Sequence, residues 1–186
     1  MSLLALDRLR QRFGDVVLAS HSFRGDDTAL VKKEHVIEVL SFLKTEPDLA
    51  FDFPSDLTVV DHLGREPRFE VVYQLLSIKH KHRVRVKAPV SEEEPTIASA
   101  TLLFRGWNWF EREAFDMYGI RFEGHPDLRR MFMYDQFVGH PLRKDYPADR
   151  SQPLVPFREG YEKLPPFDEF EGMSFGRQTF RSGKVD

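Results

Sequence analysis

The chain has 186 residues, with 27 lysine and arginine residues against 30 aspartate and glutamate residues, and a formal net charge of −3. This length is enough for one domain with a hydrophobic core and a possible extension, and the charge gives no general attraction to nucleic acid or to an anionic membrane. The sequence contains no cysteine, which excludes disulfide bonds, cysteine-ligated zinc and iron–sulfur ligation by this chain.

The first part of the chain alternates helical and strand patterns. Apolar residues spaced by three and four predict two helices, at 3–13 and 34–45. Alternating or continuous apolar runs predict strands, at 16–23, 28–32, 57–60, 69–78 and 82–89. Pro54 is expected to break the segment before 57–60. We therefore predict an α+β domain with one small mixed or antiparallel sheet and helices packed on one face.

The basic stretch at 79–87 carries its cations at odd positions, whereas Val84 and Val86 fall on the opposite parity. This period of two is typical of a hairpin with a solvated basic face. Nucleic-acid binding is disfavoured, because no aromatic side chains are interleaved with the cations. Zinc binding through His80 and His82 is disfavoured as well, because a third ligand is missing.

The stretch at 107–147 mixes helix, stop signal, turns and charges more densely than any other part. Its first third predicts a helix with an apolar stripe, formed by Leu103, Trp107, Phe110, Ala114 and Met117. Thr96 or Ser99 is expected to cap the helical region that leads to Trp107. Gly119 predicts the end of the helix at Tyr118, since glycine readily adopts the positive φ of a C-terminal stop.

The charges on this helix allow two interpretations. Glu111 and Glu113 are about 200° apart around the axis and cannot form an acid–base pair, whereas Arg112 can reach Asp116 at a spacing of four. One interpretation is a solvated face with that weak ion pair. The other is that the carboxylates meet arginines from the following segment or from another chain.

The following segment contains a near-repeat, in which Gly124-His125-Pro126 and Gly139-His140-Pro141 are each followed by a pair of cations. Glycine and proline at these positions are typical of turns. Between the turns lies the apolar run 131–134. Turns that present cations around an apolar centre indicate a surface that another molecule covers. A metal site through His125 and His140 is disfavoured for want of a third ligand.

These blocks resemble the thirty-kilodalton subunit family of respiratory complex I. The resemblance rests on Glu-Arg-Glu at 111–113, Phe-Asp-Met-Tyr-Gly-Ile at 115–120, Gly-His-Pro-Asp-Leu-Arg-Arg at 124–130 and Pro-Leu-Arg-Lys-Asp-Tyr-Pro at 141–147. It covers about forty residues with the family's spacing between blocks, which is far more specific than a single short motif. Subunits of membrane-bound [NiFe] hydrogenases and of related quinone or F420 oxidoreductases are similar, but less closely.

The resemblance implies a cofactor-free structural subunit in the peripheral arm of NADH:quinone oxidoreductase, an assembly that couples electron transfer from NADH to quinone to proton translocation. The implied partners are the quinone-site subunit and the subunit with the terminal iron–sulfur cluster, and FMN and iron–sulfur clusters are expected in partner subunits. No apolar run is long enough to span a bilayer, and the apolar run at 3–6 is too short for a signal peptide. The expected location is therefore the cytoplasmic side of a bacterial inner membrane, with attachment through partners.

The resemblance also implies a partner interface without catalytic, cofactor-binding or metal residues in this chain. Its expected residues are Glu111, Arg112, Glu113, Asp116, His125, Asp127, Arg129, Arg130, His140, Arg143, Lys144 and Asp145. The expected organisation is an α+β domain at 1–120, a turn-rich interface segment at 121–147 and an extended partner-binding tail at 148–186. Aromatic residues recur among prolines in this tail, which favours an arm on a partner, and a flexible terminus is the alternative.

Two alternatives remain. One is an equivalent scaffold subunit in a membrane-bound [NiFe] hydrogenase or an F420-type oxidoreductase. The other is a stand-alone small enzyme that uses Glu113 and Asp116 as a carboxylate pair together with His125. The second is disfavoured, because the sequence shows no nucleophile-elbow context and no glycine-rich phosphate loop.

Overall fold

A computed structural model describes residues 3–155 of the chain. The predicted tail at 148–186 lies mainly outside these described residues. The chain divides into two compact units, Met1–Gln152 and Pro153–Asp186, and the architecture below is that of the first.

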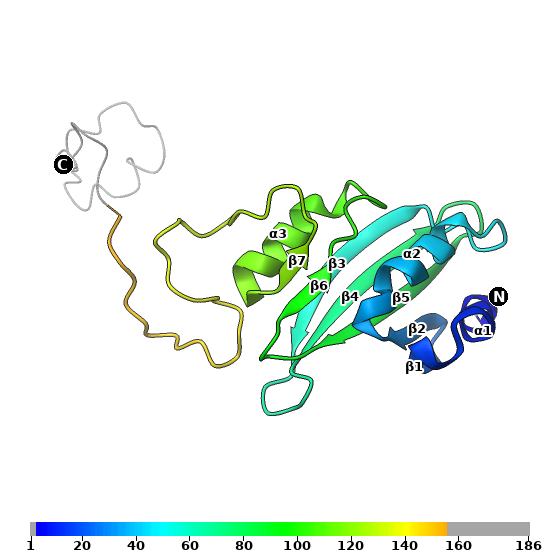
Figure 1. Cartoon of the computed structure of the whole chain (residues 1–186), viewed down its shortest axis with the longest axis horizontal. Coiled ribbons are helices and arrows are strands. Elements are labelled where there is room, and N and C mark those ends of the chain that lie inside the picture. Colours follow the sequence, from blue (N-terminus) through cyan, green and yellow to red (C-terminus); the bar gives the residue numbers. More distant parts are fainter. Residues whose placement is uncertain (1–2, 156–186) are drawn as a thin grey trace, which may run out of the picture. The chain divides into compact units, whose positions relative to one another are not determined.

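The first unit is built on a five-stranded mixed sheet (Figure 1). Its strands are β1 (Val17–Phe23), β2 (Asp26–Val31), β3 (Phe53–Asp61), β4 (Phe69–Ser77) and β5 (His82–Val90). The strand order is β1-β2-β5-β4-β3, with β2 and β5 parallel and the other neighbours antiparallel. A separate parallel pair joins β6 (Thr96–Ala98) to β7 (Arg121–Glu123). The predicted α+β class with one mixed sheet is confirmed.

Three α-helices accompany the sheet, namely α1 (Leu3–Phe13), α2 (Val36–Thr45) and α3 (Trp107–Tyr118), together with short 3-10 turns at Gly14–Val16 and Lys33–His35. Helices α2 and α3 lie over one face of the sheet (Figure 1), and α1 packs beside β1 and β2. The core forms between them from alternate residues of β4 and β5, such as Tyr73 and Val86, and from Leu40 and Trp107 on the helices.

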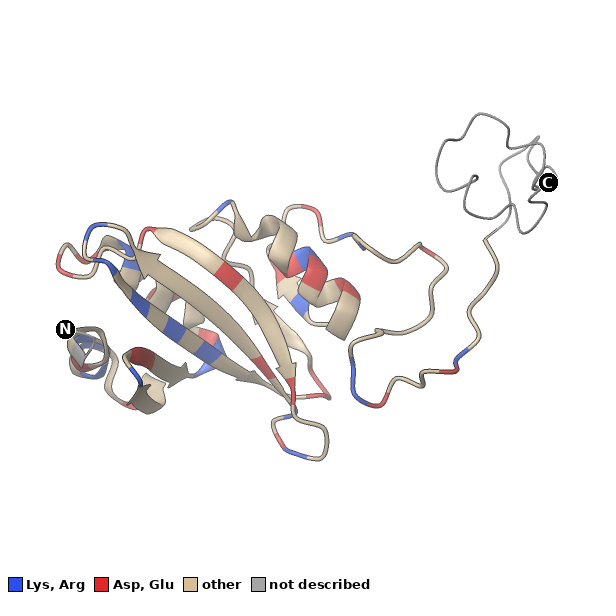
Figure 2. Ribbon diagram, turned by 180° about the vertical axis from the view of Figure 1, so that it is seen from behind, with Lys and Arg blue, Asp and Glu red and all other residues tan. Residues whose placement is uncertain are grey.

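Seen from behind, the sheet presents a face that no described helix covers, and cations follow one another along one strand (Figure 2). That strand is β5, where Arg83, Arg85 and Lys87 alternate with the buried Val84 and Val86. The predicted basic face of a hairpin is confirmed. The alternation arises because successive side chains of a strand point to opposite faces.

One local prediction holds in part, and another is wrong. Thr96 does not cap a helix, because it begins β6. Ser99, the other candidate, accepts the N–H of Thr101 at 3.3 Å, at the start of the turn that leads to Trp107. The N-cap residue of α3 is Gly106, which makes no side-chain cap.

Pro54 does not break its strand, because β3 runs through it with an irregularity between Pro54 and Asp56. β3 is an edge strand. Proline is tolerated on such a strand, because its missing N–H can face the side that has no neighbouring strand, where no hydrogen bond is lost.

Helix α3 ends at Tyr118, as predicted. Gly119 has φ 79°, and its N–H donates to the carbonyl of Phe115 at 2.8 Å. A Cβ at Gly119 would lie 2.6 Å from the ring of His140 and 2.8 Å from the guanidinium of Arg143. Glycine is therefore required here twice, for the backbone conformation and for the close approach of the segment that follows.

This double requirement separates Gly119 from Gly124, which has φ 81° but open space around the position of a Cβ. We expect Gly124→Ala to lower the free energy of unfolding by about 1 kcal/mol through backbone strain alone. Gly119→Ala should lower it by about 2–4 kcal/mol, because the overlap with His140 adds to the strain. Urea denaturation of both variants measures the difference. Equal losses would show that the close approach to Gly119 is not maintained in solution.

Candidate partner interface

Asp116 is fully buried although it lies on the side of α3 opposite to the core. It follows Trp107, which is also fully buried, by nine residues, or about half a turn beyond two full turns. Residues 124–152, which contain no helix or strand, cross this outer side. We call them the crossing segment. Helix α3 is thus enclosed between the sheet on one side and the crossing segment on the other.

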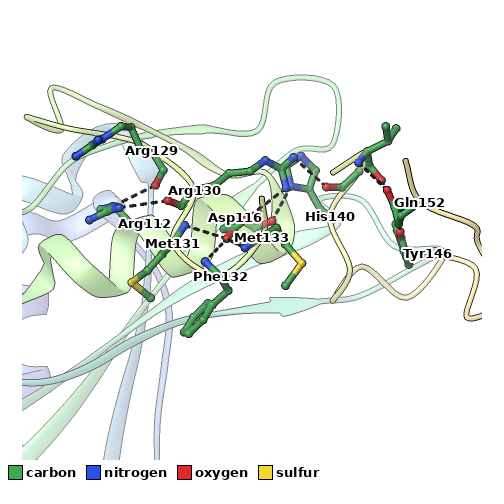
Figure 3. Close-up of polar contacts among 12 residues, drawn as sticks. Arg112, Asp116, Arg129, Arg130, Met131, Phe132, Met133, His140, Tyr146 and Gln152 are labelled. Carbon is green, nitrogen blue, oxygen red and sulfur yellow. Dashed lines mark hydrogen bonds and ion pairs between the residues drawn. The ribbon is translucent and has the colours of Figure 1, made fainter. Parts of the chain in front are cut away.

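The carboxylate of Asp116 holds the crossing segment in place (Figure 3). Its Oδ2 accepts three backbone N–H groups, from Met131 at 3.0 Å, Phe132 at 2.8 Å and Met133 at 2.9 Å. Its Oδ1 accepts from the guanidinium of Arg130 at 3.0 Å. Four donors, one of them charged, compensate for the burial of this carboxylate.

The two arginines beside Asp116 have different functions. Arg130 is the ionic partner of Asp116, and it also donates to the carbonyl of Gly139 at 3.1 Å. Arg112 instead donates to the carbonyls of Arg129 at 3.1 Å and Arg130 at 3.2 Å. The predicted pair between Arg112 and Asp116 is therefore wrong, whereas the alternative, an arginine from the following segment, is confirmed for Asp116. Two residues four apart on a helix can touch, but such a pair stabilises the fold less than four hydrogen bonds that converge on one carboxylate.

The second Gly-His-Pro turn closes the C-terminal end of α3. Nδ1 of His140 donates to the carbonyl of Asp116 at 2.9 Å, the N–H of Leu142 to that of Met117 at 3.1 Å, and Nε of Arg143 to that of Tyr118 at 2.6 Å. These carbonyls have no partner within the helix. Burial lowers the pKa of His140, which favours the neutral ring that carries its proton on Nδ1.

The first Gly-His-Pro turn uses its histidine differently. Nδ1 of His125 accepts the N–H of Asp127 at 3.0 Å, and Nε2 donates to the carbonyl of Asn108 at 3.2 Å. The two near-repeats therefore require opposite tautomers of their histidines. Because both ring nitrogens of His125 and the whole carboxylate of Asp116 bind backbone groups or Arg130, the enzyme-like arrangement with Glu113 does not form.

A second anchor joins the crossing segment to the sheet through Arg68, which no motif in the sequence indicated. Its side chain is 3% exposed, and its guanidinium binds Asp61 through two bonds of 2.9 Å. It also binds Asp145 at 2.6 and 3.1 Å and Glu92 at 2.5 Å. The hydrogen bonds from Arg68 lower the pKa of both Asp61 and Asp145. No periodicity marks this arginine, because it directly precedes an apolar strand.

Asp61 contributes a further bond to this anchor, since its Oδ2 accepts the N–H of Lys144 at 2.8 Å. The guanidinium of Arg143 lies over the ring of Phe69, 5.2 Å from its centre, and that of Arg68 lies 5.0 Å from the same centre. The predicted residues 143–145 therefore fasten the segment to the end of β3 and the start of β4.

Glu111 is predicted as a charged partner contact, but it lies inside the chain. It is fully buried, and it accepts the hydroxyl of Ser99 at 2.6 Å and the N–H of Ala100 at 2.7 Å. Burial raises its pKa to about 7. Its position on the core side of α3 places it against the turn that joins β6 to α3, so it cannot contact a partner from there.

The remaining predicted residues lie nearer the surface. Asp127, Arg129, Lys144 and Asp145 are exposed, and Arg112, Glu113, His125, Arg130, His140 and Arg143 are partly buried. Arg129 and Asp127 bind each other through two bonds of 2.7 Å. Glu113 forms no side-chain hydrogen bond or ion pair with any described residue, and is therefore available to a neighbour.

The described residues contain no group of three or more histidine, cysteine, aspartate or glutamate side chains placed to hold a metal ion. Within the same residues, no helix combines the length and the apolar character that crossing a membrane requires.

Comparison with known proteins assigns the family. The family described as "Respiratory-chain NADH dehydrogenase, 30 Kd subunit" matches residues 29–152, a range that includes both anchors of the crossing segment. The chain belongs to this family. The resemblance inferred from the motif blocks is thereby confirmed.

The relatives of this 30 Kd family member match it over nearly their whole length. The NADH-quinone oxidoreductase C subunit of Citrifermentans bemidjiense is 49% identical over 85% of this chain and 94% of the relative. The same subunit of Geotalea uraniireducens is 47% identical over 85% of this chain and 92% of its own length. That of a Roseiflexus strain is 46% identical over 83% and 88%, respectively.

Two solved structures are similar to the fold. A trypsin-resistant fragment of Nqo5, residues 1–134, has a TM-score of 0.60 at 30% identity and covers 69% of this chain and 100% of the fragment. A chain of the membrane-bound sulfane sulfur reductase, an archaeal respiratory membrane complex, has a TM-score of 0.66 at 20% identity over 89% of this chain and 94% of that chain. At that identity the second likeness shows the fold alone.

The role of Asp116 predicts a local loss of order. Asp116→Asn leaves Arg130 without its ionic partner, and we expect amide hydrogen exchange at 131–133 to accelerate by about 100-fold, which corresponds to about 3 kcal/mol. Amides of β4 and β5 should keep their protection. Glu113→Gln, the same change on the same helix at an unpaired carboxylate, is the control and should leave all these rates unchanged. Retained protection of 131–133 in Asp116→Asn would contradict the assigned anchor.

The raised pKa of Glu111 predicts a pH dependence. A carboxyl whose pKa is higher in the folded than in the unfolded state stabilises the fold below its unfolded pKa of about 4.5, and this contribution is lost as the pH rises through about 7. Relative to Glu111→Gln, the wild type should therefore lose up to about 3 kcal/mol of unfolding free energy between about pH 5 and pH 8. Urea denaturation at several pH values measures this difference. A difference that is independent of pH would exclude the shifted pKa.

Proposed function

We propose that this chain is a cofactor-free structural subunit of the peripheral arm of NADH:quinone oxidoreductase. It supports electron transfer from NADH to quinone, coupled to proton translocation, by holding neighbouring subunits in register. The observation that carries the proposal is the crossing segment, whose backbone has no secondary structure of its own but is fixed through two buried charges, Asp116 and Arg68. The family match ends at residue 152, with the end of this segment.

A segment fixed in this way is suited to binding a partner. An irregular segment that orders only on binding loses conformational entropy at that step, which weakens association. Here the buried ion pairs and the cap on α3 order the segment beforehand. Its exposed residues, among them Arg129 and Lys144, can then meet complementary groups in a defined arrangement.

We further propose that the direct neighbours are the quinone-site subunit and the subunit that carries the terminal iron–sulfur cluster. The iron–sulfur clusters and FMN belong to partner subunits, since this sequence offers no cysteine to ligate iron. The chain is proposed to lie on the cytoplasmic side of the inner membrane and to be held there through its partners.

A second candidate is the equivalent scaffold subunit of another respiratory membrane complex, such as a membrane-bound [NiFe] hydrogenase or an F420-type oxidoreductase. It is favoured by the shared fold with a chain of the sulfane sulfur reductase complex. The identity of 43–49% to several C subunits of NADH-quinone oxidoreductase favours the NADH-linked assembly.

Purification of the tagged chain from its own host, with companions identified by mass spectrometry, distinguishes the two candidates. Subunits of NADH:quinone oxidoreductase are expected. Glu113→Ala and Arg129→Ala should each reduce the yield of assembled complex and its quinone reductase activity together, because both side chains are accessible at the proposed interface. Lys33→Ala, at the weak surface pair with Glu94, is a control with no expected effect. Wild-type levels of assembled complex in both interface variants would remove these residues from the interface.

A further inference from the structure

The two tryptophans of the chain lie two residues apart on α3 but in opposite environments. Trp107 is fully buried in the core, whereas Trp109 is 60% exposed. Two residues correspond to about 200° around a helix, so Trp109 lies on the outer side, where the crossing segment covers Asp116 but leaves the tryptophan open. An exposed aromatic side chain of this size leaves more apolar area in water than almost any other surface residue, and burial of that area is favourable.

The ring of Trp109 contacts an arginine that the crossing segment holds in place. The guanidinium of Arg112 lies 5.0 Å from the ring centre, a distance typical of cation–π contacts. Arg112 is itself fixed by the carbonyls of Arg129 and Arg130. Because the ring rests against an immobilised cation, it loses little conformational freedom when a partner binds.

Two further groups lie on the outer side of α3. Glu113, four residues after Trp109 and so adjacent to it on the helix, has no ionic partner among the described residues. Phe132 is 59% exposed, and its N–H is bound to Asp116, which shares a side of α3 with Trp109 at a spacing of seven. We call Trp109 and Glu113 the Trp109 surface.

We propose that Trp109 is the aromatic anchor through which this chain docks onto a neighbouring subunit of its complex. The matching subunit offers an apolar pocket for the indole, bordered by a lysine or arginine that pairs with Glu113. This inference rests on the proposed function, because it takes the partner from the same assembly. Tryptophan and arginine are enriched among the residues that dominate binding energy at protein interfaces, where they fill desolvated pockets.

The charge of the surface selects this occupant. Asp116, Asp127 and Arg130 are neutralised within the chain, so Glu113 is the carboxylate of this side of α3 that lacks a cation among the described residues. A second copy of this chain would bring another Glu113 to a symmetric contact, which is repulsive. A partner cation beside an apolar pocket satisfies both the indole and the carboxylate.

The chain itself offers a matched control. Phe23, on β1, is 65% exposed and carries the guanidinium of Arg24 at 5.1 Å from its ring centre. It lies at the opposite edge of the sheet from β3, the strand on which α3 packs. Trp109→Ala and Phe23→Ala thus remove comparable exposed aromatic rings from two distant places.

The test uses the assembled complex purified through a tag on this chain. The dissociation rate of the tagged chain, measured by exchange against an excess of untagged chain, should rise at least about 30-fold in Trp109→Ala, the equivalent of the 2 kcal/mol that defines a dominant interface residue. Trp109→Phe should retain part of the affinity, and Phe23→Ala should behave as wild type. An unchanged rate in Trp109→Ala would overturn the inference while the proposed function stands. Failure of the wild-type chain to retain any subunit would instead overturn the proposed function.

Hydroxyl-radical footprinting gives a direct second measurement. In the isolated chain Trp109 should be oxidised and Trp107 protected, and in the complex Trp109 should become protected at least about tenfold, as expected for a desolvated anchor. Oxidation of Trp109 that is equal in both states would overturn the inference. Protection already present in the isolated chain would overturn it too, because the surface would then be covered by a second copy or by residues 156–186.

Discussion

The ordered course of the crossing segment depends on the burial of one carboxylate, that of Asp116. A buried carboxylate without partners is strongly destabilising, and no group on α3 itself binds this one. Folding of the helix against the sheet therefore leaves a charge on its outer side that water or the crossing segment must satisfy. Three consecutive backbone N–H groups and the guanidinium of Arg130 do so, and this fixes the path of a segment that has no hydrogen-bonded ladder or helix of its own.

The second buried charge, on Arg68, makes the arrangement cooperative. The guanidinium joins the end of β3 through Asp61 to the end of the crossing segment through Asp145, while His140 and Arg143 close the open carbonyls of α3 between the two anchors. Gly119 makes this possible, because any larger residue would occupy the space of the His140 ring. Helix end, turn and sheet are thus interdependent, and the loss of one contact exposes charged groups in the others.

Local chemistry allowed the sequence to predict much of this framework. The end of α3 at Gly119, the turns at Gly-His-Pro and the alternation along β5 follow from backbone freedom and the period of a strand, which depend on a few neighbouring residues. The partner of Asp116 and the cluster around Arg68 could not be predicted in this way, because Arg68 and Asp145 are separated by 77 positions and only the fold brings them together. The burial of Glu111 escaped prediction for the same reason, since a charged residue on an amphipathic helix is normally exposed.

The charges and aromatic rings of α3 consequently divide between two tasks. Glu111 and Asp116 point to opposite sides of the helix, and both bind backbone groups of this chain. These two motif residues therefore stabilise the fold around α3 and do not form a charged interface. Trp109 and Glu113 lie on the outer side of the helix near Asp116 and remain accessible. A subunit with the proposed scaffold function must present fixed groups to its neighbours, and the buried charges supply that fixity. Binding specificity then falls to the few side chains that the internal bonds leave unpaired.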